Sequence, residues 1–181
     1  IVSARTLGGP RDNAGVSLFI VDRQSAGLHL QSFKTIDGRR AAEITLKDVT
    51  VPAGSLLGAE GKGVAALEAC RDRAIAALCA EATGAMDVLN SATLEYTKTR
   101  KQFGVALGTF QVLQHRMVDM FIALQEATSL SQHLNLTVAE GDQHVSKLAS
   151  GAKSKIGEAA RFVGEQAIQL HGGMGMSDEL N

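Results

Sequence analysis

Long stretches of helical apolar spacing constrain the fold of this chain more than any other feature. Both prolines lie at or before Pro52, so none interrupts the later stretches. A first helix is predicted from about Gly61 to Lys98, with apolar positions at Val64, Leu67, Ala74, Leu78 and Met86. A second begins at Gly108 or Thr109, with a stripe of Leu113, Met117, Met120, Phe121, Leu124 and Leu134. After a break at Gly141 and Asp142, a third carries Val145, Leu148, Ala152, Ile156, Val163, Ala167 and Leu170.

Helices of roughly 25–35 residues exceed the average length of about 11–12, and such helices usually form an up-down bundle. Gly151, Gly157 and Gly164 fall inside the third helix, where each costs up to about 1 kcal/mol relative to alanine. We expect close crossing of a neighbouring helix to compensate for them.

The first third of the chain has the two-residue alternation of β-strands. Residues 16–21, 28–33 and 41–49 predict strands, with a turn at Asp37 and Gly38. Three or four antiparallel strands are too few for a whole domain. Because the chain starts at Ile1, without Met or a signal peptide, we expect it to be a piece of a longer protein. The predicted fold class is therefore mainly α: an up-down bundle of long helices preceded by a partial antiparallel β segment.

The composition indicates which classes of partner to expect and in which compartment the protein functions. A net charge of −1 gives no reason to expect nucleic acid or an anionic membrane, and no apolar run reaches the length of a membrane span. Aromatic residues make up only 4% of the chain, so the core is expected to consist of Ala, Leu, Val and Met. Cys70 and Cys79 are expected to be small buried residues in a reducing compartment, the cytoplasm.

The motifs of several common active sites are missing. No histidine has a glutamate three positions before it, which excludes the di-iron bundle pattern. There is no Cys-x-x-Cys and no His-x-x-x-His, so zinc is not predicted either. The glycine cluster near the end follows a helix rather than a strand, so it is not a dinucleotide-binding fingerprint. We expect no metal site.

Two clusters remain that suit a phosphorylated cofactor. The sequence RKQFG begins at Arg100, between two predicted helices, and QLHGGMG begins at Gln169, at the end of the third. An arginine beside an aromatic residue offers a charge for phosphate and a face for a ring. Glycines at the end of a helix let a flat or phosphorylated ligand approach the main chain.

These motifs, in this order along the chain, resemble the acyl-CoA dehydrogenase family. Residues 1–58 are similar to the C-terminal part of its middle β-domain, and residues 59–181 to its C-terminal helical bundle domain, truncated at its end. Short matches such as Arg71-Asp-Arg and Gln114-His-Arg are most similar to the bacterial branch that includes small subunits of pimeloyl-CoA dehydrogenases.

The resemblance implies that this chain contacts the FAD of a neighbouring subunit. Arg100 would face its pyrophosphate, with Phe103 against the cofactor and Phe110 and Gln111 nearby. Gln169, Gly172 and Gly173 would pack on its adenosine half. The alternative for Arg100 is a surface ion pair, and the alternative for Phe103 and Phe110 is a core contact between helices. We favour the cofactor for Arg100, Gln169 and Gly173, whereas both interpretations stay open for Phe110 and Gln111.

The family chemistry implied is FAD-dependent α,β-dehydrogenation of an acyl-CoA thioester, with electrons passed to an electron-transfer flavoprotein. The catalytic glutamate is expected beyond Asn181, because Ala74 and Ile75 stand where a minority of members carry it on the first long helix. Asp72 matches a substrate-binding aspartate whose usual arginine is replaced by Ile75, with Arg73 as a possible substitute. Asp178 and Glu179 would lie near the path of CoA. Alone, the chain should be inactive.

Other interpretations stay open at this stage. The chain could belong to a non-catalytic subunit of a hetero-oligomeric dehydrogenase, or to a flavin monooxygenase or oxidase of the same fold. It could also serve only as an oligomerisation bundle. The long apolar helices favour a homo-oligomer, a dimer or tetramer as is common in the family.

Overall fold

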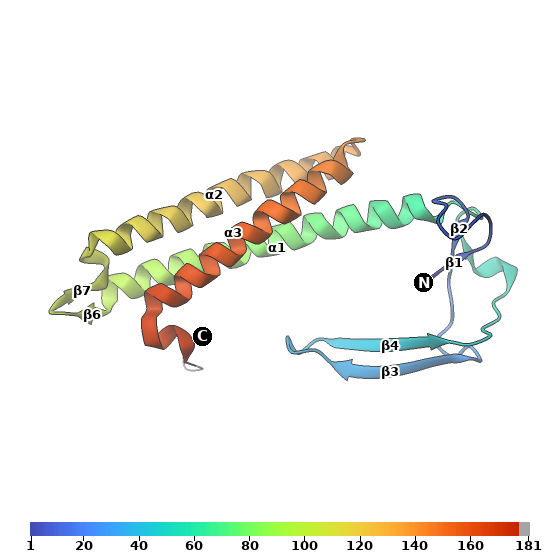
Figure 1. Ribbon diagram of the computed structural model, residues 1–181, viewed down its shortest axis with the longest axis horizontal. Coiled ribbons are helices and arrows are strands. Elements are labelled where there is room, and N and C mark those ends of the chain that lie inside the picture. Colours follow the sequence, from blue (N-terminus) through green and yellow to red (C-terminus); the bar gives the residue numbers. More distant parts are fainter. Residues whose placement is uncertain (178–181) are drawn as a thin grey trace. The chain divides into compact units, whose positions relative to one another are not determined.

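The computed structural model of the protein describes residues 1–177. The chain divides into two compact units, residues 1–68 and residues 69 onward. The first contains most of the strands and the second most of three long helices (Figure 1). The predicted fold class, mainly α with a partial antiparallel β segment, is confirmed. The assignment of residues 1–58 and 59–181 to two domains stays a prediction.

The strands of the first unit form two separate sheets. Strands β1 (Val2–Arg5), β2 (Val16–Phe19) and β5 (Leu56–Leu57) make an antiparallel sheet in the order β1-β2-β5. Strands β3 (Leu28–Lys34) and β4 (Arg40–Leu46) form a hairpin closed by the predicted turn at Asp37 and Gly38. Strand β1 was not predicted from the sequence, because four residues are too few to establish a period and none of them is buried. A short 3-10 turn, η1 (Ala53–Ser55), precedes β5.

The three-stranded sheet fixes the start of the first helix. The buried hydroxyl of Ser17 on β2 accepts the backbone N–H of Gly61 at 2.8 Å and lies 2.7 Å from the hydroxyl of Thr6. A Cβ on Gly63 would lie 2.9 Å from the carbonyl oxygen of Val16. Only glycine therefore lets the helix begin this close to β2.

The second unit consists of three packed helices and short connecting pieces. These helices are α1 (Gly63–Thr99), α2 (Gln111–Glu140) and α3 (Val145–His171). Between α1 and α2 lie strands β6 (Lys101–Gln102) and β7 (Val105–Ala106) and the 3-10 turn η2 (Leu107–Thr109). Gly141, with φ of 69°, ends α2 at the predicted break, and η3 (Gly172–Met176) follows α3. Among the described residues, no helix is long and apolar enough to cross a membrane.

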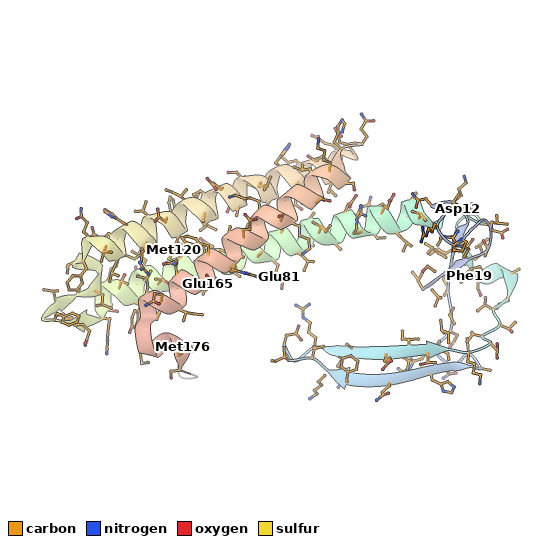
Figure 2. The ribbon with its side chains drawn as sticks, in the orientation of Figure 1. Asp12, Phe19, Glu81, Met120, Glu165 and Met176 are labelled. Carbon is orange, nitrogen blue, oxygen red and sulfur yellow. The ribbon has the colours of Figure 1, made fainter. Side chains whose placement is uncertain are left out.

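All three helices contribute to one core, with Met120 of α2 fully buried within it (Figure 2). Its buried members are mostly alanines and medium-sized aliphatic residues: Ala76, Cys79, Met86, Met120, Leu124, Ala127, Leu134, Ala149, Ala152, Ile156, Val163, Ala167 and Leu170. The composition predicted such a core. On α2 the stripe follows positions 120, 124, 127, 131 and 134. Phe121 lies beside it and is 55% exposed, so its predicted core position is wrong.

Two further expectations about the helices are wrong. An added Cβ at Gly151, Gly157 or Gly164 would meet no atom within 4 Å, so no neighbouring helix crosses closely there. Cys79 is buried, as expected, but Cys70 is exposed. Nine residues at about 100° each amount to two and a half turns, which places the two cysteines on opposite sides of α1. Burial raises the pKa of the Cys79 thiol, although Lys153 opposes this rise.

Candidate functional site

A hollow at one end of the bundle gathers residues from both sequence clusters. Its volume is about 490 Å³, and its lining comes mainly from the end of α1, the β6–β7 connection and the end of α3. Figure 1 shows these segments at one end of the bundle. The lining residues are Tyr96, Arg100, Gln102, Leu107, Leu113, Gln169, Leu170, His171, Gly172, Gly173 and Met174. Of the predicted cofactor contacts, the fold brings Arg100, Gln169, Gly172 and Gly173 together here. Phe103, Phe110 and Gln111 are not among the lining residues.

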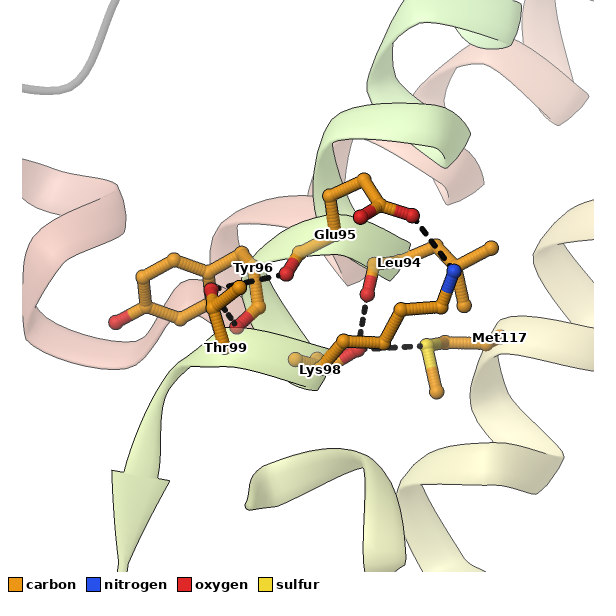
Figure 3. A network of polar contacts seen from close by, with 7 residues as sticks. Leu94, Glu95, Tyr96, Lys98, Thr99 and Met117 are labelled. Carbon is orange, nitrogen blue, oxygen red and sulfur yellow. Dashed lines mark hydrogen bonds and ion pairs between the residues drawn. The ribbon is translucent and has the colours of Figure 1, made fainter.

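Arg100 is the first residue after α1, and its main chain is held on both sides. Its N–H donates to the carbonyl of Tyr96 at 2.8 Å, and its carbonyl accepts the N–H of Leu107 at 2.9 Å. The preceding turn is tied locally, since Lys98 pairs with Glu95 at 2.6 Å and the hydroxyl of Thr99 donates to the carbonyls of Glu95 and Tyr96 (Figure 3). The exposed guanidinium of Arg100 has no ion-pair partner among residues 1–177, so the surface ion pair considered for it is not present.

Phe103 stands at the tip of the β6–β7 hairpin in an unusual backbone conformation. Phe103 and Gly104 form the two-residue turn, with φ of 56° and 83°. Positive φ is costly for an aromatic residue. The Phe103 side chain is 90% exposed and meets the half-buried ring of Phe110 edge-on, with ring centres 6.2 Å apart. Phe103 is therefore no core contact between helices, and a strained, exposed aromatic residue is a candidate for ligand binding.

The turn after α3 contains three glycines, which differ in the space around them. Gly172 ends the helix with φ of 61°, and its N–H donates to the carbonyl of Gln169. A Cβ on Gly172 or Gly173 would meet no atom within 4 Å, so both residues are open on that side. At Gly175 a Cβ would lie 2.6 Å from the carbonyl oxygen of Ile168. Gly175 therefore serves the packing of the turn, whereas Gly172 and Gly173 leave room for a ligand.

Asp72 lies near the other end of α1, about 40 Å from Arg100 at a rise of 1.5 Å per residue. Its carboxylate is buried and pairs with Arg71 at 2.9 Å. Arg71 also donates to the hydroxyl of Ser146 on α3 at 2.7 Å. Asp72 and Arg73 line a second, smaller hollow of about 260 Å³ beside the α2–α3 connection. Asp72 and Arg100 thus belong to separate sites on this chain.

The described residues contain no group of three or more His, Cys, Asp or Glu side chains able to hold a metal ion. Asp178 and Glu179, expected near the path of CoA, lie outside the described residues.

Comparison with known proteins identifies the family. The model of the family described as "Acyl-CoA dehydrogenase, C-terminal domain" matches residues 61–181, more than half of the chain. The chain belongs to the acyl-CoA dehydrogenase family. The curated relatives include "Probable acyl-CoA dehydrogenase YngJ" of Bacillus subtilis, 34% identical over 99% of this chain and 48% of that protein. The human mitochondrial short-chain specific acyl-CoA dehydrogenase is 30% identical over 93% of this chain and 41% of that protein. The chain thus spans about half the length of the curated relatives it matches.

Several solved structures match almost the whole chain. Butyryl-CoA dehydrogenase from Megasphaera elsdenii superposes with a TM-score of 0.89 at 28% identity, covering 99% of this chain and 47% of that one. A structure described as "FAD complex of PigA" gives the same values. The prolyl acyl carrier protein oxidase AnaB matches with a TM-score of 0.86 at 27% identity, covering 97% of this chain and 47% of that one.

Two further residues that the sequence did not predict as site residues also line the hollow. These are Tyr96 and His171: their rings lie 4.3 Å apart, and the Tyr96 hydroxyl donates to the His171 carbonyl at 3.3 Å. His171 lies inside the QLHGGMG motif, and Tyr96 is the only tyrosine of the chain. Only the fold reveals that they meet, because α1 and α3 are far apart in sequence.

Proposed function

We propose that this chain is the C-terminal part of an FAD-dependent acyl-CoA dehydrogenase, which introduces a double bond between the α and β carbons of an acyl-CoA thioester. The observation that carries the proposal is the hollow in which Arg100 meets Gln169 and the Gly172–Gly173 turn. Membership of the family and the names of the relatives support the reaction class.

The donor set of the hollow suits FAD. Among the described residues that line the hollow, Arg100 is the only lysine or arginine, and a guanidinium binds a diphosphate well. Gln169 adds a side-chain amide, and the open backbone at Gly172 and Gly173 lets a ligand approach closely. When bound, FAD supplies the acceptor for the hydride that leaves the substrate β-carbon. We assign this hollow to the FAD of a neighbouring subunit, with Phe103, Phe110 and Gln111 at its edge.

On the substrate side, we assign Asp72 to the acyl-CoA site. Arg73 would take the role of the arginine that is usual in the family and is replaced here by Ile75. Both residues line the second hollow, and the pair with Arg71 keeps the Asp72 carboxylate fixed. The α-proton of the substrate needs a carboxylate base. Ala74 and Ile75 leave no carboxylate at the α1 positions where a minority of the family carry the base. We propose that the base lies beyond Asn181 and that the chain by itself is inactive.

The proposal extends to partners. Helices α1 and α2 leave large apolar side chains exposed, among them Leu78, Val88, Phe121 and Leu136. An apolar surface of this extent favours packing against other subunits, as a homo-oligomer or hetero-oligomer. An electron-transfer flavoprotein is the proposed electron acceptor. The cytoplasm is the proposed compartment, where the free thiols of Cys70 and Cys79 stay reduced.

A second candidate is an oxidase acting on a thioester of a carrier protein. It is favoured by the likeness to the prolyl acyl carrier protein oxidase and to the L-prolyl-[peptidyl-carrier protein] dehydrogenase of a Serratia strain. A non-catalytic subunit and a bundle that serves only oligomerisation are the remaining alternatives.

The test is the visible spectrum of the purified complete protein during anaerobic titration with a panel of acyl-CoAs and acyl-carrier proteins. The proposed dehydrogenase carries flavin, and its absorption band bleaches with at least one acyl-CoA. Bleaching only by acyl-carrier proteins, with rapid reoxidation in air, would favour the second candidate. A flavin that no thioester reduces would point to a non-catalytic subunit. If the protein takes up no flavin, the bundle that serves only oligomerisation is the one remaining alternative.

A further inference from the structure

The half-buried His171 at the end of α3 makes three contacts, with Tyr96 of α1 and Ala167 of α3. Its ring packs on Tyr96 with 4.3 Å between centres and an angle of 32° between planes. The Tyr96 hydroxyl donates to the His171 carbonyl at 3.3 Å. The Nδ1 atom of His171 lies 2.8 Å from the carbonyl oxygen of Ala167, one turn earlier on α3. Contacts to α1 and α3 thus fix both its ring and its main chain.

This geometry determines that one particular ring nitrogen carries a hydrogen. A carbonyl oxygen only accepts hydrogen bonds, so Nδ1 must carry the hydrogen and donate it to Ala167. In the neutral ring, Nε2 is then a hydrogen-bond acceptor. Nε2 has no hydrogen-bond partner among residues 1–177, and His171 lines the same hollow as Arg100 and Gln169. One acceptor of defined tautomer is therefore available at the site.

The same contacts hold the glycine turn. Gly172 and Gly173 follow His171 directly, and the carbonyl of His171 is the last main-chain group before them. Because Tyr96 lies only four residues before Arg100, its bond to that carbonyl joins the turn to the part of α1 that carries the arginine. The Tyr96–His171 pair thus sets how the two halves of the hollow face each other.

We propose that Tyr96 and His171 are positioning residues of the cofactor site. Tyr96 holds the turn at Gly172 and Gly173 against the end of α1, and His171 offers Nε2 as an acceptor for a hydroxyl group of the ligand. This inference rests on the proposed function, since the ligand whose diphosphate Arg100 binds is FAD, which carries ribose and ribityl hydroxyls. The guanidinium of Arg100 donates to phosphate, whereas Nε2 in the Nδ1–H tautomer of His171 accepts from a hydroxyl. The two side chains therefore bind different groups of the ligand.

The test uses the complete protein, stripped of flavin and titrated with FAD, in four variants. His171→Phe keeps a ring beside Tyr96 but removes both nitrogens, and His171→Gln restores an acceptor. Tyr96→Phe removes only the hydroxyl. His115→Phe is the matched control, because His115 is an exposed histidine of α2 outside the hollow. The dissociation constant of FAD and the melting temperature of the apoprotein are measured for each variant.

We expect His171→Phe to weaken FAD binding about tenfold and Tyr96→Phe about threefold, the scale of one or two lost hydrogen bonds. His171→Gln should recover part of the affinity, and His115→Phe should match the wild type. Wild-type affinity in His171→Phe, or a lower melting temperature without any loss of affinity, would overturn the inference.

Arg100→Ala separates this result from a failure of the proposed function. If Arg100→Ala loses FAD while His171→Phe and Tyr96→Phe keep it, only the inference about the Tyr96–His171 pair is wrong. If Arg100→Ala keeps FAD at wild-type affinity, the assignment of the hollow is wrong. A complete protein that binds no FAD would overturn both.

Discussion

Replacing Gly175 by alanine should disrupt the turn after α3, whereas the same change at Gly173 should not. A Cβ on Gly175 would lie 2.6 Å from the carbonyl oxygen of Ile168 and 3.1 Å from its Cα. Both are backbone atoms of α3, which cannot rotate away as a side chain can. Forcing a methyl group into such a space typically costs 1–3 kcal/mol. At Gly173 the added Cβ meets nothing within 4 Å.

The assay is hydrogen exchange of the peptide that covers residues 164–177 in the complete protein. A destabilisation of about 2 kcal/mol makes local opening roughly thirtyfold more frequent, so the amides of Gly175→Ala should exchange faster by that factor. Gly173→Ala is the matched control and should exchange like the wild type. Equal exchange in the two variants would refute the reasoning, because it would mean that Gly175 does not pack against Ile168 as described.

Three further predictions concern strain, helix packing and thiol reactivity. Phe103→Asn should leave the melting temperature unchanged or higher, since asparagine tolerates φ of 56°. The same variant should retain less FAD on gel filtration. A lower melting temperature with full FAD retention would contradict both expectations. Gly157→Ala should stabilise α3 against urea by up to about 1 kcal/mol, because no atom lies within 4 Å of the added Cβ; destabilisation would reveal a close neighbour at this face. Cys79→Ser should not change maleimide labelling of the native protein. Burial raises the pKa of the Cys79 thiol and so lowers the fraction present as thiolate. Reduced labelling of the variant would show that Cys79 is accessible.

The helical part of the fold could be predicted from the sequence because its signals are local. A long run of residues without proline lets α1 continue uninterrupted. Gly141 ends α2 through the left-handed conformation that glycine readily adopts. The predictions were wrong where burial or close packing depends on residues of other helices. The apolar Phe121 is one position away from the buried stripe, and the glycines of α3 have no helix across them.

The candidate site was predictable in part. Arg100 and Gln169 stand out because their residue types suit phosphate and because their motifs resemble those of the acyl-CoA dehydrogenase family. Arg100 and Gln169 line one hollow because the C-terminal ends of α1 and α3 lie close together. No local sequence pattern predicts this arrangement. The Tyr96–His171 pair was missed for this reason.

The most direct test of the account is the flavin content of the complete protein with Arg100→Ala, beside Lys101→Ala as the control. Lys101 is an exposed neighbour that does not line the hollow. Losing one partner of a charge pair costs about 2 kcal/mol or more, roughly thirtyfold in the dissociation constant. We predict that Arg100→Ala loses FAD on gel filtration while Lys101→Ala retains it. Equal flavin content in the two variants, with the bundle folded in both, would contradict the assignment of this hollow to FAD.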